Sequence, residues 1–268
     1  MNTGIVRLDA EDGSTAEISP HGAQVLAWHP AGEPESRLYL NPNARRDTSL
    51  PVRGGIPILF PQFGLFGDLP KHGLVRTQPW STLPRQAQHE AVFELHDTAE
   101  TYALWPHAFA LQATITLAPR ALTVSVSARN LGPSPFGFTA GLHTYLRVTD
   151  TTTATLSGLA GHRYLDALDN LAARDERDTL LPTRGPLDRV YLQACKPIRL
   201  DDGQRCLHIA QSGFEDVVVW NPGPNGVPAD MPNGDQHRMV CVEAAQIARP
   251  ITLAPGAGWH GSQTLTTG

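Results

Sequence analysis

His143 is the first residue in this sequence whose type and setting could support proton transfer. It lies in the segment GLHTYL (141–146), at what reads as the start or end of a strand. An imidazole changes charge near neutral pH, so it can act as a general acid or a general base. The chain has 11 histidines, however, and a single histidine is more often a structural residue than a catalyst. His143 therefore needs a partner before it predicts chemistry.

Glu243 is a candidate partner. It closes the apolar run MVCVE (239–243), where a carboxylate is unusual because burying a glutamate is costly unless it is paired or functional. Alternation along a strand predicts that Glu243 shares one face with Met239 and Cys241. The ordinary alternative is an exposed strand end, because strands often finish in a charged residue.

Positive charge gathers in the segment LPKHGLVR (69–76). It places Lys71, His72 and Arg76, three potential cations, within six residues around a flexible glycine. In a protein that is acidic overall, such a cluster suits an anion, since guanidinium groups match phosphate oxygens two at a time. An ordinary polar loop is the alternative.

Two further charged residues stand beside apolar stretches. Arg53 opens RGGIPILFPQFGLFG (53–67), in which two adjacent glycines allow a close backbone approach and two prolines bracket an apolar run. That run could equally be a buried strand bent by its prolines. Asp188 lies in LDRVY, before a short strand-like stretch. Pairing with Arg189 or plain solvation would explain it.

β-Strands are the elements that must position these residues. Apolar and polar residues alternate over 111–117 and again over 122–128, with a turn at 118–121, which predicts a hairpin. Further strands are expected at 5–8, 16–18, 92–95, 217–220, 239–243 and 251–253. The 23 prolines and 24 glycines are spread evenly and leave few windows for a helix. Only 164–175 looks mildly helical.

Composition sets the class of protein. The chain has 268 residues, 41% of them hydrophobic and 18% charged, which predicts an all-β sandwich folded as one domain over 1–268. A net charge of −5 lacks the basic footprint of a nucleic-acid binder. We expect no signal peptide in the first thirty residues and no membrane span. Three cysteines without CxxC spacing predict buried, reduced thiols in a cytoplasmic protein.

The order of these motifs is more specific than any one of them. The chain reads RGG-I-P-x-x-F-P, then H-G-x-x-R, G-x-H-T-Y, L-D-R-x-Y, V-V-W-N-P and C-V-E. From Arg53 to about Trp259 it resembles the glucose-6-phosphate 1-epimerases, the hexose-6-phosphate mutarotases related to aldose 1-epimerase. The resemblance implies a large antiparallel β-sandwich of the galactose-mutarotase type. It departs from the family pattern at Lys71, where glutamine is more usual.

The resemblance also implies roles for the motif residues. His143 matches the acid and Glu243 the base. The substrate-binding positions, or residues within their motifs, are Arg53, Lys71, His72, Arg76 and Asp188. The expected reaction interconverts the α and β anomers of a hexose 6-phosphate, with no cofactor and no metal. Its chemistry asks for an ionised Glu243 beside a protonated His143, which their mutual attraction would favour.

Other readings of the sequence remain open at this stage. An aldose 1-epimerase acting on unphosphorylated sugars would share the acid and the base. A non-catalytic carbohydrate-binding sandwich would need aromatic platforms, and the five tryptophans are scattered along the chain. A glycoside hydrolase would bring two carboxylates and ranks last. We expect a monomer that binds a small sugar phosphate and has neither nucleic acid nor membrane as a partner.

Overall fold

The computed structural model describes residues 4–44 and 51–268, and antiparallel sheets account for most of its regular structure. The nine-stranded sheet contains, in spatial order, β14 (Leu181–Pro182), β11 (Thr155–Ser157), β16 (Ile198–Asp201), β17 (Cys206–Ser212), β20 (Gly258–Thr267), β8 (Ala121–Asn130), β7 (Phe109–Ala118), β6 (Glu90–His96) and β5 (Ser81–Thr82). The eight-stranded sheet contains β13 (Ala172–Asp175), β12 (Arg163–Asp166), β15 (Leu187–Tyr191), β18 (Asp216–Asn221), β19 (Met239–Leu253), β9 (Phe136–Leu142) and β4 (Ile58–Leu59), with β10 (Tyr145–Arg147) paired to β19.

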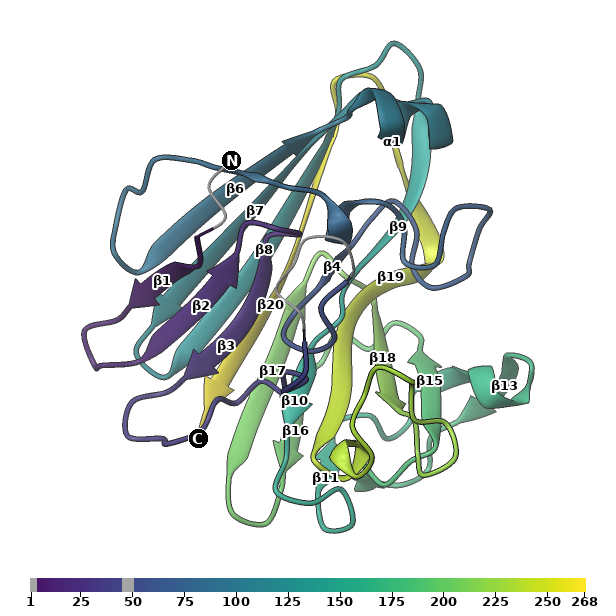
Figure 1. Ribbon diagram of the computed structural model, residues 1–268. Coiled ribbons are helices and arrows are strands. Elements are labelled where there is room, and N and C mark those ends of the chain that lie inside the picture. Colours follow the sequence, from purple (N-terminus) through teal and green to yellow (C-terminus); the bar gives the residue numbers. More distant parts are fainter. Residues whose placement is uncertain (1–3, 45–50) are drawn as a thin grey trace.

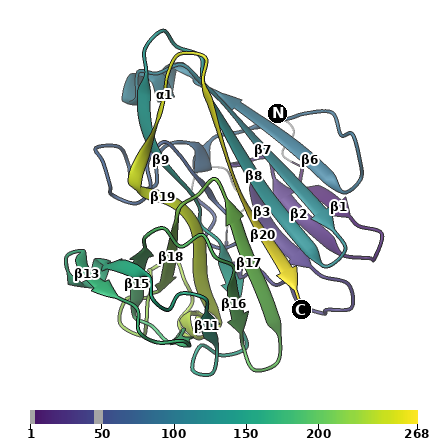
Figure 2. The same ribbon diagram turned by 180° about the vertical axis from the view of Figure 1, so that it is seen from behind.

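A smaller sheet covers part of the nine-stranded one. Its strands are β1 (Val6–Asp9), β2 (Thr15–Ser19) and β3 (Gln24–His29). It lies in front of β7 and β8 in Figure 1 and behind them in Figure 2, so it packs on one face of those strands. The predicted antiparallel β-sandwich is therefore confirmed.

One apolar core joins the three sheets. Its cluster of buried side chains includes Trp28 from β3, Phe93 from β6 and Val242 from β19. The predicted hairpin is present as β7 and β8, and along both strands buried residues alternate with partly exposed ones. This core is what a single folded unit requires, and one domain over 1–268 stays a prediction.

Helices are few and short. Within the described ranges, α1 (Ala99–Leu104) is the one α-helix, and Thr98 caps it through a capping box with Thr101. Single 3₁₀ turns lie at η1 (Val75–Thr77), η2 (Ala167–Asp169) and η3 (Asp235–His237). No helix in this part of the chain is long and apolar enough to cross a bilayer.

Two expectations about elements were wrong. The segment 164–175 forms β12, η2 and β13 rather than a helix, because β12 pairs with β15 and positive φ angles at Asn170 and Leu171 turn the chain back. The two strands expected at 239–243 and 251–253 are one strand, β19, with a register shift between Gln246 and Ile251.

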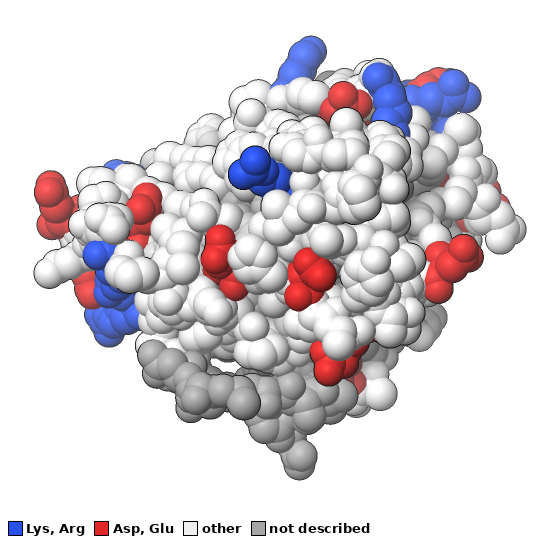
Figure 3. Space-filling view, turned by 90° about the horizontal axis from the view of Figure 1, so that it is seen from above, with Lys and Arg blue, Asp and Glu red and all other residues white. Residues whose placement is uncertain are grey.

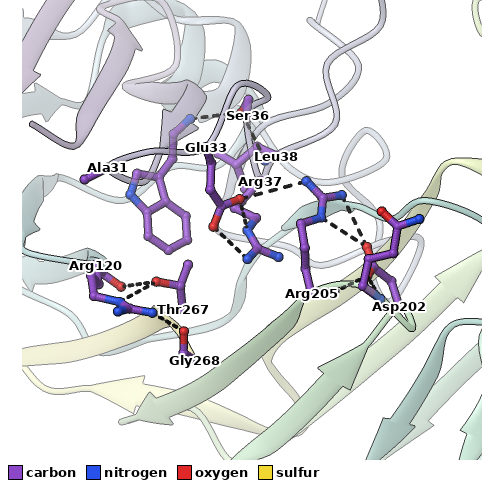
Figure 4. Close-up of polar contacts among 12 residues, drawn as sticks. Ala31, Glu33, Ser36, Arg37, Leu38, Arg120, Asp202, Arg205, Thr267 and Gly268 are labelled. Atoms are coloured by element: carbon purple, nitrogen blue, oxygen red, sulfur yellow. Dashed lines mark hydrogen bonds and ion pairs between the residues drawn. The ribbon is translucent and has the colours of Figure 1, made fainter.

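Polar bridges tie the loop after β3 to the turn between β16 and β17. In Figure 4, Glu33 lies between Arg37 and Arg205, and Arg205 also reaches Asp202. Arg37 Nη2 donates to Glu33 Oε1 at 2.7 Å, and Arg205 Nη2 lies 3.2 Å from Asp202 Oδ2. Because Arg37 is buried, its charge needs this partner. Glu33 Oε2 also lies 3.9 Å from Arg205 Nη1, and this contact links the loop after β3 to the nine-stranded sheet.

A second polar bridge runs through the core to the strands of the candidate site. Gln263 on β20 is buried, and its Nε2 donates to the carbonyl of Val242 on β19 at 3.0 Å. Its Oε1 accepts a hydrogen bond from the Thr144 hydroxyl. One amide of the nine-stranded sheet therefore holds two segments of the eight-stranded sheet.

The glycine pair of the RGG motif allows the close backbone approach that the sequence predicted. Gly55 has φ +63°, and a Cβ there would lie 2.0 Å from the carbonyl oxygen of Val25. Its own N–H donates to Tyr39 O at 2.7 Å, and its carbonyl accepts from the N–H of Tyr145 at 2.9 Å. The chain packs here at a distance that only glycine permits.

Gly55→Ala should therefore lower the free energy of unfolding by about 2–5 kcal/mol, from left-handed strain plus backbone overlap. Gly256→Ala is the matched control, because Gly256 also has a positive φ but a Cβ there meets nothing within 4 Å. It should cost only about 1–2 kcal/mol. Chemical denaturation measures both values, and equal losses would contradict this explanation.

Candidate active site

Strand pairing brings His143 beside Glu243. β9 ends at Leu142, which pairs with Ala244 of β19. Because the strands are antiparallel, His143 after Leu142 lies opposite Glu243 before Ala244. His143 Nδ1 lies 3.3 Å from Glu243 Oε1. The His143 N–H donates to the carbonyl of Pro57 at 2.9 Å, which fixes its backbone.

Glu243 lies within β19 rather than at an exposed strand end. Its exposed fraction is 2%, because the strand continues for ten residues beyond it. The predicted alternation is confirmed, since Val242 packs into the main core while Cys241 packs in a separate cluster with Met239. The carboxylate is therefore buried on the face away from the main core.

A cavity of about 980 Å³ opens on this pair. It is lined by every residue that the sequence singled out: Arg53, Lys71, His72, Arg76, His143, Asp188 and Glu243. These residues come from segments spread over 190 positions (53 to 243) of the chain. The structure brings the predicted set together in one place.

Arg53 is held at the wall of this cavity by two contacts. Its Nε lies 2.9 Å from both carboxylate oxygens of Asp230, and its Nη1 donates to the Tyr145 hydroxyl at 3.3 Å. Tyr145 in turn stacks on His143, with ring centroids 4.6 Å apart and planes 8° apart. The guanidinium is thereby oriented relative to the imidazole. Asp230 lies in a loop, and no signal in the sequence pointed to it.

The basic segment contributes two cations, not the three that its sequence suggested. Arg76 Nη2 donates to the carbonyl of Lys71 at 2.9 Å, so the two residues stay together. His72 accepts the N–H of Gly64 at its Nδ1. Burial, followed by the charges of Arg76 and Lys71, lowers the pKa of His72 to about 3. His72 is therefore neutral, with the remaining ring proton on Nε2.

Asp188 does not pair with Arg189, because neighbouring residues of a strand point to opposite faces. Arg189 reaches Glu176 at 2.7 Å, whereas Asp188 lines the cavity. Burial raises the pKa of Asp188, and the charge of Lys71 opposes that rise. The carboxylate lies across the strands from Trp220.

Trp220 is a wall residue whose role the sequence analysis missed. It lies in the VVWNP motif, on β18, and lines the cavity. Its ring meets His143 nearly edge-on, with centroids 6.2 Å apart and planes at 82°. The scattered positions of the tryptophans therefore hid one aromatic wall, which only strand pairing reveals.

The charges of the pair differ from the sequence expectation. Burial, followed by His72 and the cations Arg53, Arg76 and Lys71, lowers the pKa of His143 well below its ordinary value. Burial, followed by Asp188, raises the pKa of Glu243 well above its ordinary value. Both directions favour the uncharged forms in the protein alone, because burial penalises each charge. These directions run against the ion pair that the sequence predicted.

The cysteines also depart in part from expectation. Cys195, Cys206 and Cys241 are all free thiols, but only Cys241 is buried.

Surface charges agree with the composition: in Figure 3, acidic and basic residues are scattered over a mainly uncharged face. That pattern fits a net charge of −5.

A β-sandwich that places a buried imidazole and a buried carboxylate side by side in the wall of a large polar cavity has the design of a mutarotase. Residues 4–266 match the family described as aldose 1-epimerase, and the chain belongs to the aldose 1-epimerase family. The resemblance that the motifs predicted is confirmed.

Relatives and solved structures agree with this assignment. Proteins from Cenchrus ciliaris (33% identical, covering 94% of this chain and 80% of the relative) and Escherichia coli strain K12 (34%, 93% and 86%) are each named "putative glucose-6-phosphate 1-epimerase". A "putative mutarotase" structure from Salmonella typhimurium has a TM-score of 0.86 at 29% identity, over 95% of this chain and 87% of the other. The Slr1438 protein from Synechocystis sp. PCC 6803 shares the fold, with a TM-score of 0.84 at 23% identity over 100% and 96% of the two chains.

The buried carboxyl predicts a pH-dependent stability. The folded-state pKa of Glu243 is raised, so the folded protein holds this proton more tightly than the unfolded chain does. Stability is then lost as the pH rises from the ordinary value of 4.5 through the folded-state pKa. Glu243→Gln cannot ionise and should be more stable than the wild type by about 1 kcal/mol or more near pH 8.

Chemical denaturation at about pH 4.5 and about pH 8 measures this difference. The gap between the two proteins should be small at the lower pH and grow at the higher one. Glu215→Gln, at a side chain that is 44% exposed, should follow the wild type at both. A stability gap that does not change with pH would show that the substitution acts through packing instead.

Proposed function

We propose that this protein interconverts the α and β anomers of a hexose 6-phosphate, with glucose 6-phosphate as the first substrate to test. The observation that carries the proposal is the cavity, in which an imidazole and a carboxylate in contact share the walls with Arg53, Lys71 and Arg76. Membership in the aldose 1-epimerase family and the names of the relatives support it.

Anomer exchange requires the sugar ring to open and close with no net change in bonds. Glu243 takes the proton of the C1 hydroxyl while His143 gives a proton to the ring oxygen. The C1–C2 bond then rotates, and the two groups exchange roles as the ring closes. Each proton transfer of this kind contributes on the order of 10²–10⁴-fold to the rate.

One exchangeable proton is shared between His143 and Glu243, and the net charge of the pair is zero wherever that proton lies. With the proton on Glu243 both groups are uncharged, and with the proton on His143 they form the ion pair that ring opening uses. The 3.3 Å contact between them allows that transfer, so no proton has to come from solvent.

A bound phosphate favours the reactive arrangement. After burial and His72, the charges that lower the pKa of His143 belong to Arg53, Arg76 and Lys71. A phosphate held by those side chains neutralises them, so substrate binding raises the pKa of His143. An unphosphorylated sugar lacks this effect, which is why the phosphate matters for chemistry as well as for affinity.

The other cavity residues hold the sugar. Asp188 accepts hydrogen bonds from ring hydroxyls, and neutral His72 donates from Nε2.

We place the protein in the cytoplasm as a monomer, without nucleic acid or membrane as a partner. The free cysteines and the negative net charge support that placement.

Glu243→Gln should lower the catalysed anomerisation rate at least about a hundredfold, because it removes the base. Exchange NMR on glucose 6-phosphate measures the rate above the spontaneous one. Glu215→Gln changes the same residue type outside the cavity and should keep wild-type activity. Retention of most activity in Glu243→Gln would exclude this residue as the base.

Arg76→Ala should raise KM for glucose 6-phosphate roughly ten- to a hundredfold, the equivalent of losing ~1.5–3 kcal/mol of charge-assisted hydrogen bonding. KM for free glucose should change much less. Arg249→Ala, at an exposed position outside the cavity, is the control. Equal effects on both sugars would argue for an aldose 1-epimerase of neutral sugars, and binding without turnover would argue for a carbohydrate-binding sandwich.

A further inference from the structure

Three potential metal ligands lie close together beside the cavity, where His143 and Glu243 line its wall and Cys241 does not. They are the imidazole of His143, the thiol of Cys241 and the carboxylate of Glu243. One ligand atom from each lies within 4.8 Å of the others, and all three residues are buried. Proton transfer by the pair accounts for His143 and Glu243, but it gives Cys241 no part.

Cys241 reaches this position through strand pairing. It lies two residues before Glu243 on the same face of β19 and is fully buried. Its cross-strand neighbours are Trp220 and Tyr145, which line the cavity. Across residues 4–44 and 51–268, the thiol has no hydrogen-bond partner. It lies beside the pair as a sulfur ligand without another polar contact.

Two other atoms of the group also lack partners. His143 Nδ1 lies 3.3 Å from Glu243 Oε1 but makes no hydrogen bond among the described residues, and Glu243 Oε2 also makes none. Buried polar atoms are normally satisfied, so an exception of this kind points to a bound group. Here the unpartnered atoms belong to two of the three residues that could share a cation.

The ligand atoms can reach the spacing of a tetrahedral ion with one open position after a modest closure. Bonds of ~2.0–2.3 Å to nitrogen, oxygen and sulfur place tetrahedral ligands about 3.3–3.7 Å from one another. The Nδ1–Oε1 distance is already 3.3 Å, so the widest pair must close by no more than about 1.5 Å. Three protein ligands leave the fourth position for water or a sugar hydroxyl.

Donor chemistry and charge select the kind of ion. A thiolate with an imidazole favours a thiophilic ion such as Zn²⁺ over Mg²⁺ or Ca²⁺, which prefer oxygen. The thiol of Cys241 and the carboxyl group of Glu243 must each release a proton to solvent when the ion binds. The resulting thiolate and carboxylate together carry two negative charges, so a bound dication leaves the buried group neutral. Three cations of the cavity, Arg53, Lys71 and Arg76, oppose such an ion. Two further carboxylates on its walls, Asp188 and Asp230, offset two of these three charges.

We infer that His143, Cys241 and Glu243 form a binding site for Zn²⁺, which inhibits the protein by occupying the acid and the base together. The ion enters from the cavity, where His143 and Glu243 are reached first, and Cys241 completes the site from beneath. The binding stands on the ligand geometry, whereas the inhibition rests on the proposed function. Mg²⁺ should not inhibit.

The test uses the full chain without a polyhistidine tag. Calorimetry with Zn²⁺ alone, in the absence of sugar phosphate, should show one equivalent bound. Co²⁺ should produce the near-ultraviolet absorption of a thiolate–metal bond. Cys241→Ser should weaken Zn²⁺ binding at least about tenfold and remove the Co²⁺ signal, while anomerisation without metal stays within about threefold of the wild type. The tenfold limit follows from the loss of one ligand, and the threefold limit follows because Cys241 has no part in the proton transfers.

Matched variants separate the outcomes. Cys206→Ser removes a thiol that lies 3.9 Å from His208 and outside the cavity, and it should bind Zn²⁺ like the wild type. Cys241→Ala repeats the test should the serine variant fail to fold. The inference is overturned when Cys241 variants bind Zn²⁺ and are inhibited like the wild type, or when Cys206→Ser abolishes binding. A protein that binds Zn²⁺ through Cys241 but has no anomerase activity would refute the proposed function and leave the site standing.

Discussion

The contact between His143 and Glu243 is the constraint on which the rest of this structure depends. A carboxylate that is 2% exposed costs free energy, and the fold bears that cost by surrounding it with strands on both sides. His143 lies between β9 and β10, which both pair with β19. Gln263 from the opposite sheet binds Thr144 beside His143 and Val242 beside Glu243, and so holds the two segments together. Such support keeps the two titratable groups at a fixed distance.

Burial and the charges of the cavity lower the pKa of His143 and raise the pKa of Glu243. Burial favours a neutral imidazole and a neutral carboxyl, which is a stable resting arrangement but not the reactive one. The cations that depress the pKa of His143 are also the side chains suited to a phosphate. In the proposed reaction, a substrate that neutralises them raises the pKa of its own acid catalyst, and this links recognition of the phosphate to the chemistry at C1. The same buried pair, beside a thiol, is the group that we infer to bind Zn²⁺.

Much of the fold could be predicted from the sequence, because alternation with a period of two is a local property. The β7–β8 hairpin and the shared face of Glu243, Cys241 and Met239 follow from it directly. The segment 164–175 was mistaken for a helix because pairing with β15 outweighs local propensity. The extent of β19 was missed because its register shift interrupts the apolar pattern.

By itself, the sequence determined the family, the sandwich class and the set of seven residues that meet in the cavity. It did so because motifs and strand periodicity depend on residues that are close together in the sequence. The tertiary structure alone decided that His72 is neutral, that Asp230 orients Arg53, that Trp220 forms a wall and that Cys241 lies beside the pair. These facts depend on distances and burial between residues as many as a hundred or more positions apart. Such quantities arise only when strands from distant segments pair and exclude water.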